Sequence, residues 1–108
     1  MTRGDIVVVA ARGAYRGRPR PAVVVQSDLF NDTHASLTIC PITSDIVDAP
    51  LFRVALPPGT RTGLDVSSQV MADKIVSVPR SAVSRVMGRC DTTEVEAVAD
   101  ALRSWLQL

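Results

Sequence analysis

Histidine, cysteine and aromatic side chains are scarce in this sequence of 108 residues. The single histidine, His34, excludes a nuclease mechanism that needs two histidines, and its polar surroundings predict an exposed side chain without a catalytic role. The two cysteines, Cys40 and Cys90, lie far apart and lack Cys-x-x-Cys or Cys/His ligand spacing. We therefore expect reduced structural thiols rather than a disulfide framework.

Long hydrophobic runs are also absent. No apolar stretch approaches the roughly 20 residues that cross a bilayer, and residues 1–5 lack the apolar core of a secretory signal. We expect a protein that stays in the cytosol and does not enter membranes. The formal net charge of +1 gives no general attraction to nucleic acid.

Motifs for metals and cofactors are missing as well. The acidic residues form no compact metal-binding pattern, and several of them suit helix caps or solvated loops. The sequence contains no Gly-rich phosphate loop, no dinucleotide fingerprint and no Gly-x-Ser-x-Gly elbow. We therefore expect neither a metal nor a cofactor.

Arginine is the basic residue that the sequence does use. Of its twelve basic residues eleven are arginines, and five of these fall in the first twenty positions against the single acid Asp5. The planar guanidinium matches the oxygens of a phosphate, so this segment suits a polyanion. Taken alone, however, the pattern favours an ordinary solvated loop.

Short β-branched runs separated by turn signals predict strands. The predicted strands cover residues 5–11, 22–26, 37–42, 51–56 and 85–90, and residues 65–78 form either two short strands or one bent strand. A helical turn is predicted at 81–85. Pro41 cannot donate to a sheet ladder, so it should mark an edge, a bulge or the end of a strand.

The last segment predicts an amphipathic helix that is capped by Asp91 or Thr93. Its apolar residues repeat at helical spacing: Val95, Val98, Ala99, Leu102, Trp105 and Leu106. Glu94 near its start and Arg103 near its end oppose the helix dipole. Many short strands with one terminal helix predict a mainly β fold, a small antiparallel barrel in a single domain spanning residues 1–108.

The order of segments along the chain resembles the MazF/PemK toxins of bacterial toxin–antitoxin modules. The matching segments are Gly-Asp-Ile-Val at 4–7, Arg-Pro before the β-branched run at 20–25, Pro-Ile-Thr-Ser at 41–44, Asp-Lys-Ile at 73–75, and Gly-Arg at 88–89 before the terminal helix. The resemblance implies a small Src-homology-like antiparallel β-barrel of the PemK/CcdB type with a C-terminal amphipathic helix, assembled as a homodimer.

The same resemblance implies a type II toxin that is a sequence-specific endoribonuclease acting on single-stranded RNA. Arg20 and Thr43 would be its catalytic residues, and the residues that would bind RNA are Arg16, Arg18, Ser44, Lys74 and Ser77. The implied partners are a cognate antitoxin and, only through the antitoxin complex, operator DNA.

Physical chemistry supports this pairing of an arginine with a threonine. An internal 2′-hydroxyl can attack the adjacent phosphate without a metal, and a guanidinium and a hydroxyl donor can stabilise the charge that grows on the phosphate oxygens. Arg20 would keep its proton, so its role is charge stabilisation or leaving-group protonation rather than that of a base. Without the resemblance, Arg20 reads as a solvated or ion-paired residue and Thr43 as a turn hydroxyl.

Two positions depart from the pattern of the family. Val76 stands where the family often has a basic residue, so either Lys74 compensates or RNA is bound more weakly. Val8 stands where an aromatic residue is common. Two other functions remain open at this point. One is a CcdB-like poison that binds DNA gyrase through the C-terminal segment, and the other is a catalytically silent relative that binds only antitoxin and operator DNA.

Overall fold

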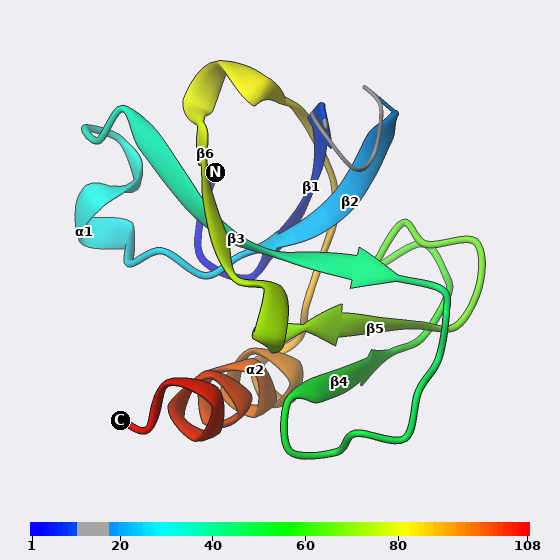
Figure 1. Ribbon diagram of the computed structural model, residues 1–108. Helices are drawn as coiled ribbons and strands as arrows, with labels where there is room; N and C mark the ends of the chain where they lie inside the picture. Colours follow the sequence, from blue (N-terminus) through cyan, green and yellow to red (C-terminus); the bar gives the residue numbers. More distant parts are fainter. Residues whose placement is uncertain (11–17) are drawn as a thin grey trace.

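The computed structural model describes residues 1–10 and 18–108 (Figure 1). Its strands are β1 (Asp5–Ala10), β2 (Pro19–Val24), β3 (Ser36–Thr43), β4 (Arg53–Leu56), β5 (Ser68–Met71), β6 (Val76–Pro79) and β7 (Val83–Arg89). Its helical segments are α1 (Asp28–Asn31), the 3-10 turns η2 (Ala72–Lys74) and η3 (Arg80–Ala82), and α2 (Thr92–Leu106).

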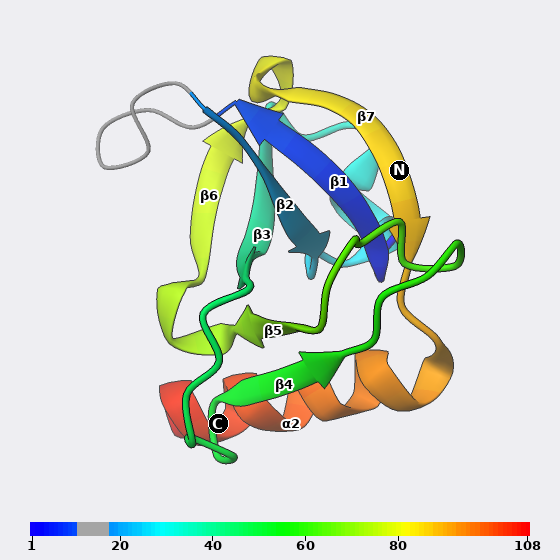
Figure 2. The same ribbon diagram turned by 90° about the vertical axis from the view of Figure 1, so that its right-hand side faces the viewer.

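The strands form one strongly curved sheet with the order β4-β5-β3-β2-β1-β7, and β6 pairs with the first half of β3. Every strand pair among the described residues is antiparallel. No pairing between described residues joins the outer strands β4 and β7, so the sheet curls like a barrel without closing (Figure 2). This architecture confirms the predicted mainly β class with one terminal helix.

Strand β3 changes its partner at Pro41. On one side it pairs with β6 as far as Ile39 and with β5 from Ile42 onward, while its other side pairs with β2. The N–H of Val25, the residue after β2, donates to the Thr38 carbonyl of β3 at 3.1 Å. Successive residues of a strand direct their backbone groups to opposite flanks, so Thr38 and Cys40 face β2 and Pro41 faces the other flank. The Pro41 nitrogen therefore points to the place where β3 changes from β6 to β5. The prediction of an edge, bulge or strand end was wrong. A residue without an N–H donor is also tolerated inside a strand, at the place where one flank of the strand changes its partner.

Two hydrophobic clusters explain why the strands read as continuous apolar runs. Alternate residues of β1, β2 and β3 belong to different clusters, as Ile6 and Val7 illustrate, because successive side chains point to opposite faces of a sheet. One cluster includes Val98 of α2, and the other lies within the curl of the sheet under β6. Each fully buried aliphatic side chain contributes about 1.5–3 kcal/mol to folding.

Helix α2 begins with a complete capping box. The Asp91 carboxylate accepts from the Glu94 N–H at 2.8 Å, and the Glu94 carboxylate accepts from the Asp91 N–H at 2.9 Å. Asp91, rather than Thr93, is therefore the cap. The helix lies along β4 in both views (Figures 1 and 2), and near its end Trp105 stacks at a tilt on Phe52, with ring centroids 5.3 Å apart.

Most predicted elements are present, with shifted bounds. The prediction of two short strands within 65–78 is confirmed, and η2 separates them. Strand β2 begins earlier than predicted, β4 begins later, and the predicted turn at 81–85 is η3 at Arg80–Ala82. The sequence did not predict α1, and position 11 of the first predicted strand lies outside the described residues. Among the described residues, no helix is long and apolar enough to span a membrane.

Candidate active site

A depression of about 380 Å³ opens where β2 and the end of β3 approach the segment between β4 and β5. Arg20 and Thr43 both line it, although they lie on different strands. The other residues that line it are Pro21, Ile42, Ser44, Gly63, Leu64, Asp65, Val66, Ser68, Met71 and Met87. The depression therefore combines one guanidinium, one carboxylate and three hydroxyl groups with an apolar floor.

Arg20 lies in β2, opposite Val9 of β1, and its side chain is exposed. The two residues after it, Pro21 and Ala22, pair with β1, and Ala22 is fully buried. Arg20 and Pro21 also line a second, more apolar hollow of about 280 Å³. The guanidinium is thus carried by a paired strand at the rim between two hollows.

Thr43 is the last residue of β3, where the chain leaves the sheet. Its hydroxyl oxygen accepts a hydrogen bond from the Asp45 N–H at 3.0 Å. This contact matches the turn role that the sequence allowed for Thr43, and it fixes the position of the oxygen. The hydroxyl proton can still be donated outward, because accepting one bond uses only a lone pair.

The opposite wall of the depression comes from the segment between β4 and β5, which sequence reasoning did not connect with the site. Gly63, Leu64, Asp65 and Val66 belong to it, and no strand pairing holds them. Inside the segment the Thr62 hydroxyl donates to the Pro57 carbonyl at 2.8 Å and accepts from the Leu64 N–H at 3.3 Å. Thr62 is 1% exposed, so these bonds are shielded from water.

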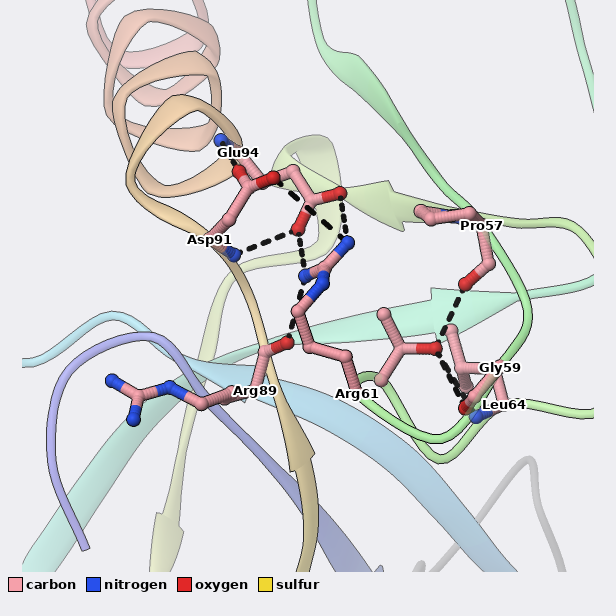
Figure 3. Close-up of polar contacts among 8 residues, drawn as sticks. Pro57, Gly59, Arg61, Leu64, Arg89, Asp91 and Glu94 are labelled. Atoms are coloured by element: carbon pink, nitrogen blue, oxygen red, sulfur yellow. Dashed lines mark hydrogen bonds and ion pairs between the residues drawn. The ribbon is translucent and has the colours of Figure 1, made fainter.

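Arg61 ties this wall to the beginning of α2 (Figure 3). Its guanidinium donates to both oxygens of Glu94, at 2.7 and 3.1 Å, and to the Arg89 carbonyl at 3.0 Å. The Arg89 N–H returns a bond to the Arg61 carbonyl at 2.8 Å. The pKa of the Arg61 guanidinium is raised, first by its hydrogen bonds to Glu94. We call Arg61, Glu94 and Arg89 the clamp.

Two glycines let the wall lie directly on β7. A Cβ on Gly88 would come within 2.1 Å of the Thr62 carbonyl oxygen, and one on Gly63 would come within 2.2 Å of the Met87 carbonyl oxygen. Gly63 also has φ +74°, a conformation that side chains disfavour. Backbone therefore packs on backbone at this contact, which brings Met87 into the depression.

The RNA-binding residues predicted from the sequence do not all lie in the depression. Ser44 lines it beside Thr43, whereas Arg18 is exposed just before β2, and Arg16 lies outside the described residues. Lys74 in η2 is exposed and Ser77 in β6 bonds to the Thr38 hydroxyl at 3.0 Å, and neither lines the depression. Their role in binding RNA stays a prediction.

Other potentially reactive groups lie elsewhere. The His34 ring contacts the backbone of Ser36 in the loop after α1. Cys40 and Cys90 are buried free thiols, and burial raises the pKa of each to about 12. Within the part of the chain that the structure describes, no group of three or more His, Cys, Asp or Glu side chains is placed to hold a metal ion.

Comparison with known proteins identifies the family. Residues 2–106 match the family model described as the PemK-like, MazF-like toxin of type II toxin-antitoxin systems. The chain belongs to this family. It is 44% identical over 106 residues to the probable endoribonuclease MazF of Mycolicibacterium smegmatis, with 98% of this chain and 96% of the relative covered. It is 36% identical over 116 residues to endoribonuclease MazF9 of Mycobacterium tuberculosis, covering 100% and 98%.

Solved structures of the family share its fold. MazF from Deinococcus radiodurans superposes with a TM-score of 0.81 at 27% identity, covering 100% of this chain and 97% of that one. An endoribonuclease in complex with its cognate antitoxin, from a mycobacterial species, gives a TM-score of 0.84 at 19% identity, covering 100% and 96%. The MazF/PemK identification made from the sequence is confirmed, and neither the gyrase poison nor the silent relative is favoured.

Proposed function

We propose that this MazF-type toxin cleaves single-stranded RNA at short specific sequences without a metal ion, with Arg20 and Thr43 as catalytic residues. The observation that carries the proposal is that both residues line one depression, although they lie 23 positions apart in sequence. Relatives at 44% and 36% identity bear the name endoribonuclease, which supports RNA as the substrate. Cleavage of messenger RNA would stop translation and arrest growth.

The chemistry follows from the groups in the depression. The ribose 2′-hydroxyl attacks the adjacent phosphorus, a 2′,3′-cyclic phosphate forms, and the bond to the 5′-oxygen breaks. Negative charge grows on the phosphate oxygens during this step, and the Arg20 guanidinium and the Thr43 hydroxyl stabilise it. DNA lacks the attacking hydroxyl and is not cut.

Binding of the RNA chain extends beyond the two catalytic residues. We assign phosphate and sugar contacts to Arg16, Arg18, Ser44, Lys74 and Ser77, because guanidinium, ammonium and hydroxyl groups all donate to phosphate oxygens. Lys74 lies in η2, and Ser77 lies in β6, which pairs with the first half of β3. The bound RNA would therefore run past the depression rather than end in it.

The proposal also names partners and a compartment. A solved relative forms a complex with its cognate antitoxin, and we propose an antitoxin partner for this chain too. We further propose that it forms a homodimer, that it reaches operator DNA only through the antitoxin complex, and that it acts in the cytoplasm, where messenger RNA is translated.

The test is RNA digestion in the presence of a chelator. We expect the wild-type protein to cut single-stranded RNA, leaving a 2′,3′-cyclic phosphate and a 5′-hydroxyl, and to spare the same sequence made of DNA. Arg20→Ala and Thr43→Ala should each lower the single-turnover rate about a hundredfold or more. Thr43→Ser keeps the hydroxyl and should keep most of the rate.

Arg85→Ala is the matched control, because Arg85 is an exposed arginine on β7 that does not line the depression. Full activity of the Arg20→Ala and Thr43→Ala variants, or cutting that needs a divalent cation, would contradict the proposal. Growth arrest with gyrase-dependent DNA breaks and intact RNA would move the assignment to a gyrase poison.

A further inference from the structure

The proposed reaction needs a group that removes the proton from the attacking 2′-hydroxyl. Arg20 cannot serve, because a guanidinium stays protonated throughout the accessible pH range. The Thr43 hydroxyl is itself a very weak base, and it already accepts a bond from the Asp45 N–H. The two residues implied by the resemblance to the family therefore leave one role unfilled.

Asp65 is the one carboxylate among the described residues that line the depression. It is exposed, and its carboxylate makes no hydrogen bond or ion pair with the residues that the structure describes. A carboxylate beside bound RNA repels the phosphates and lowers binding affinity, a cost that a role in the reaction would offset. A carboxylate that has no partner among the described residues is also available to take up a proton from the substrate.

The other acids, the histidine and both cysteines do not line the depression. His34 bonds to Ser36 in a different loop and does not line the depression. Cys40 and Cys90 are buried thiols. Residues 11–17, whose sequence is Ala-Arg-Gly-Ala-Tyr-Arg-Gly, contain neither an acid nor a histidine.

The wall that carries Asp65 is held in place before any substrate binds. Its backbone packs on β7 at Gly63 and Gly88, and the clamp fixes the preceding turn to α2. Thr43 is fixed on the other side by the end of β3 and its own turn. Fixed groups on both sides of a depression give the preorganisation that acid–base catalysis requires.

We propose that Asp65 is the general base of the RNA cleavage, an assignment that rests on the proposed function. Its carboxylate takes the proton from the 2′-hydroxyl as the new bond between the 2′-oxygen and phosphorus forms. The electron pair of the breaking bond goes to the 5′-oxygen, which takes a proton from water in the open depression. Asp65 then returns its proton to solvent, so the enzyme is regenerated without a metal, an oxidant or a second substrate.

The experiment compares cleavage with binding in Asp65 variants. We expect Asp65→Asn to lower the single-turnover cleavage rate by about 10²–10⁴-fold. Its affinity for the same RNA carrying a 2′-deoxyribose at the scissile position should be unchanged or higher, because one repulsive charge is gone. Added formate or acetate should restore part of the rate to Asp65→Ala, whose side chain leaves room for it, and none to Asp65→Asn.

Asp48→Asn is the matched control, since Asp48 is an exposed acid in the segment after Thr43 that does not line the depression. It should cut at the wild-type rate. A fully active Asp65→Asn variant would overturn the proposal, as would one that cuts at a different sequence, which would make Asp65 a reader of bases. If the wild-type protein cuts no RNA, the proposed function itself fails, and that outcome is distinct from failure of the Asp65 variants.

Discussion

Arg61 and Glu94 join two segments that lie 33 positions apart in sequence, through paired hydrogen bonds of 2.7 and 3.1 Å. One segment carries the wall of the depression and the other begins α2. Glu94 serves the capping box and the clamp together, because its Oε1 atom accepts from both the Asp91 N–H and Arg61. The position of the wall is thus coupled to the first turn of α2, a helix that does not line the depression.

Replacement of Arg61 should slow the chemical step as well as weaken substrate binding. In Arg61→Gln we expect kcat for a short RNA to fall and KM to rise, each by roughly tenfold, because the variant no longer holds the wall that carries Asp65 in position. Steady-state kinetics measure both constants. Arg103→Gln breaks the exposed Arg103–Asp100 pair on α2 and should change neither constant, whereas an unchanged kcat in Arg61→Gln would contradict the positioning role.

Gly88→Ala should destabilise the fold and distort the depression. The added methyl group would lie 2.1 Å from the Thr62 carbonyl oxygen, a backbone atom that cannot rotate away. We expect the free energy of unfolding to fall by more than about 2 kcal/mol, measured by urea titration. Val86→Ala on the same strand removes a side chain that is 48% exposed, so its effect should be much smaller.

The Arg53–Asp73 pair should make stability depend on pH. Arg53 donates two hydrogen bonds to Asp73, at 2.9 and 3.1 Å, with side chains that are 11% and 14% exposed, and these bonds lower the pKa of Asp73 below its ordinary value of 3.8. A carboxyl group whose pKa is lowered by folding stabilises the protein at pH values above its ordinary pKa. This stabilisation is lost as the pH falls through the lowered pKa.

Asp73→Asn should therefore cost about 2 kcal/mol of unfolding free energy at neutral pH. The difference in unfolding free energy between the variant and the wild type, which we call the gap, should close as the pH falls below the ordinary carboxyl pKa of 3.8. Urea titrations at a series of pH values measure the gap. Asp100→Asn, which breaks a pair whose side chains are 61% and 76% exposed, should have little effect at any pH. A gap for Asp73→Asn that persists in acid would argue against the ion pair as its source.

The two cysteines should be inert in the folded protein. Burial raises the pKa of both thiols to about 12, so almost no thiolate is present at pH 8. We expect mass spectrometry to find no iodoacetamide adduct on either cysteine at pH 8 without denaturant, and adducts on both in guanidinium. Rapid labelling of native protein would contradict the burial of these thiols.

Local patterns in the sequence predicted the elements that they specify directly. The β-branched runs and turn signals located the strands, and the apolar repeat after the candidate caps Asp91 and Thr93 located α2. Helix α1 was missed because four residues are too few for a helical repeat. Its signal was a cap, since the Ser27 hydroxyl accepts from the Leu29 N–H at 3.2 Å.

The site was only partly predictable. The family resemblance pointed to Arg20 and Thr43, and pairing of β2 with β3 explains why two such distant residues line one depression. Asp65 and the clamp were missed, because their placement depends on a loop without repeating pattern that is held by contacts to β7 and α2. The Gly63 and Gly88 positions were the available signals, since isolated glycines often mark close backbone approach.

Proline at position 41 also limits how far the neighbours of β3 can grow. Extending either β5 or β6 to meet Pro41 would require an amide hydrogen that this residue does not possess. Neither neighbour can shift its register along β3 past Pro41, so Thr43 stays paired with β5. The end of β3 that carries Thr43, one of the two proposed catalytic residues, is therefore aligned with β5 by the chain's covalent chemistry and does not wait for RNA to impose it.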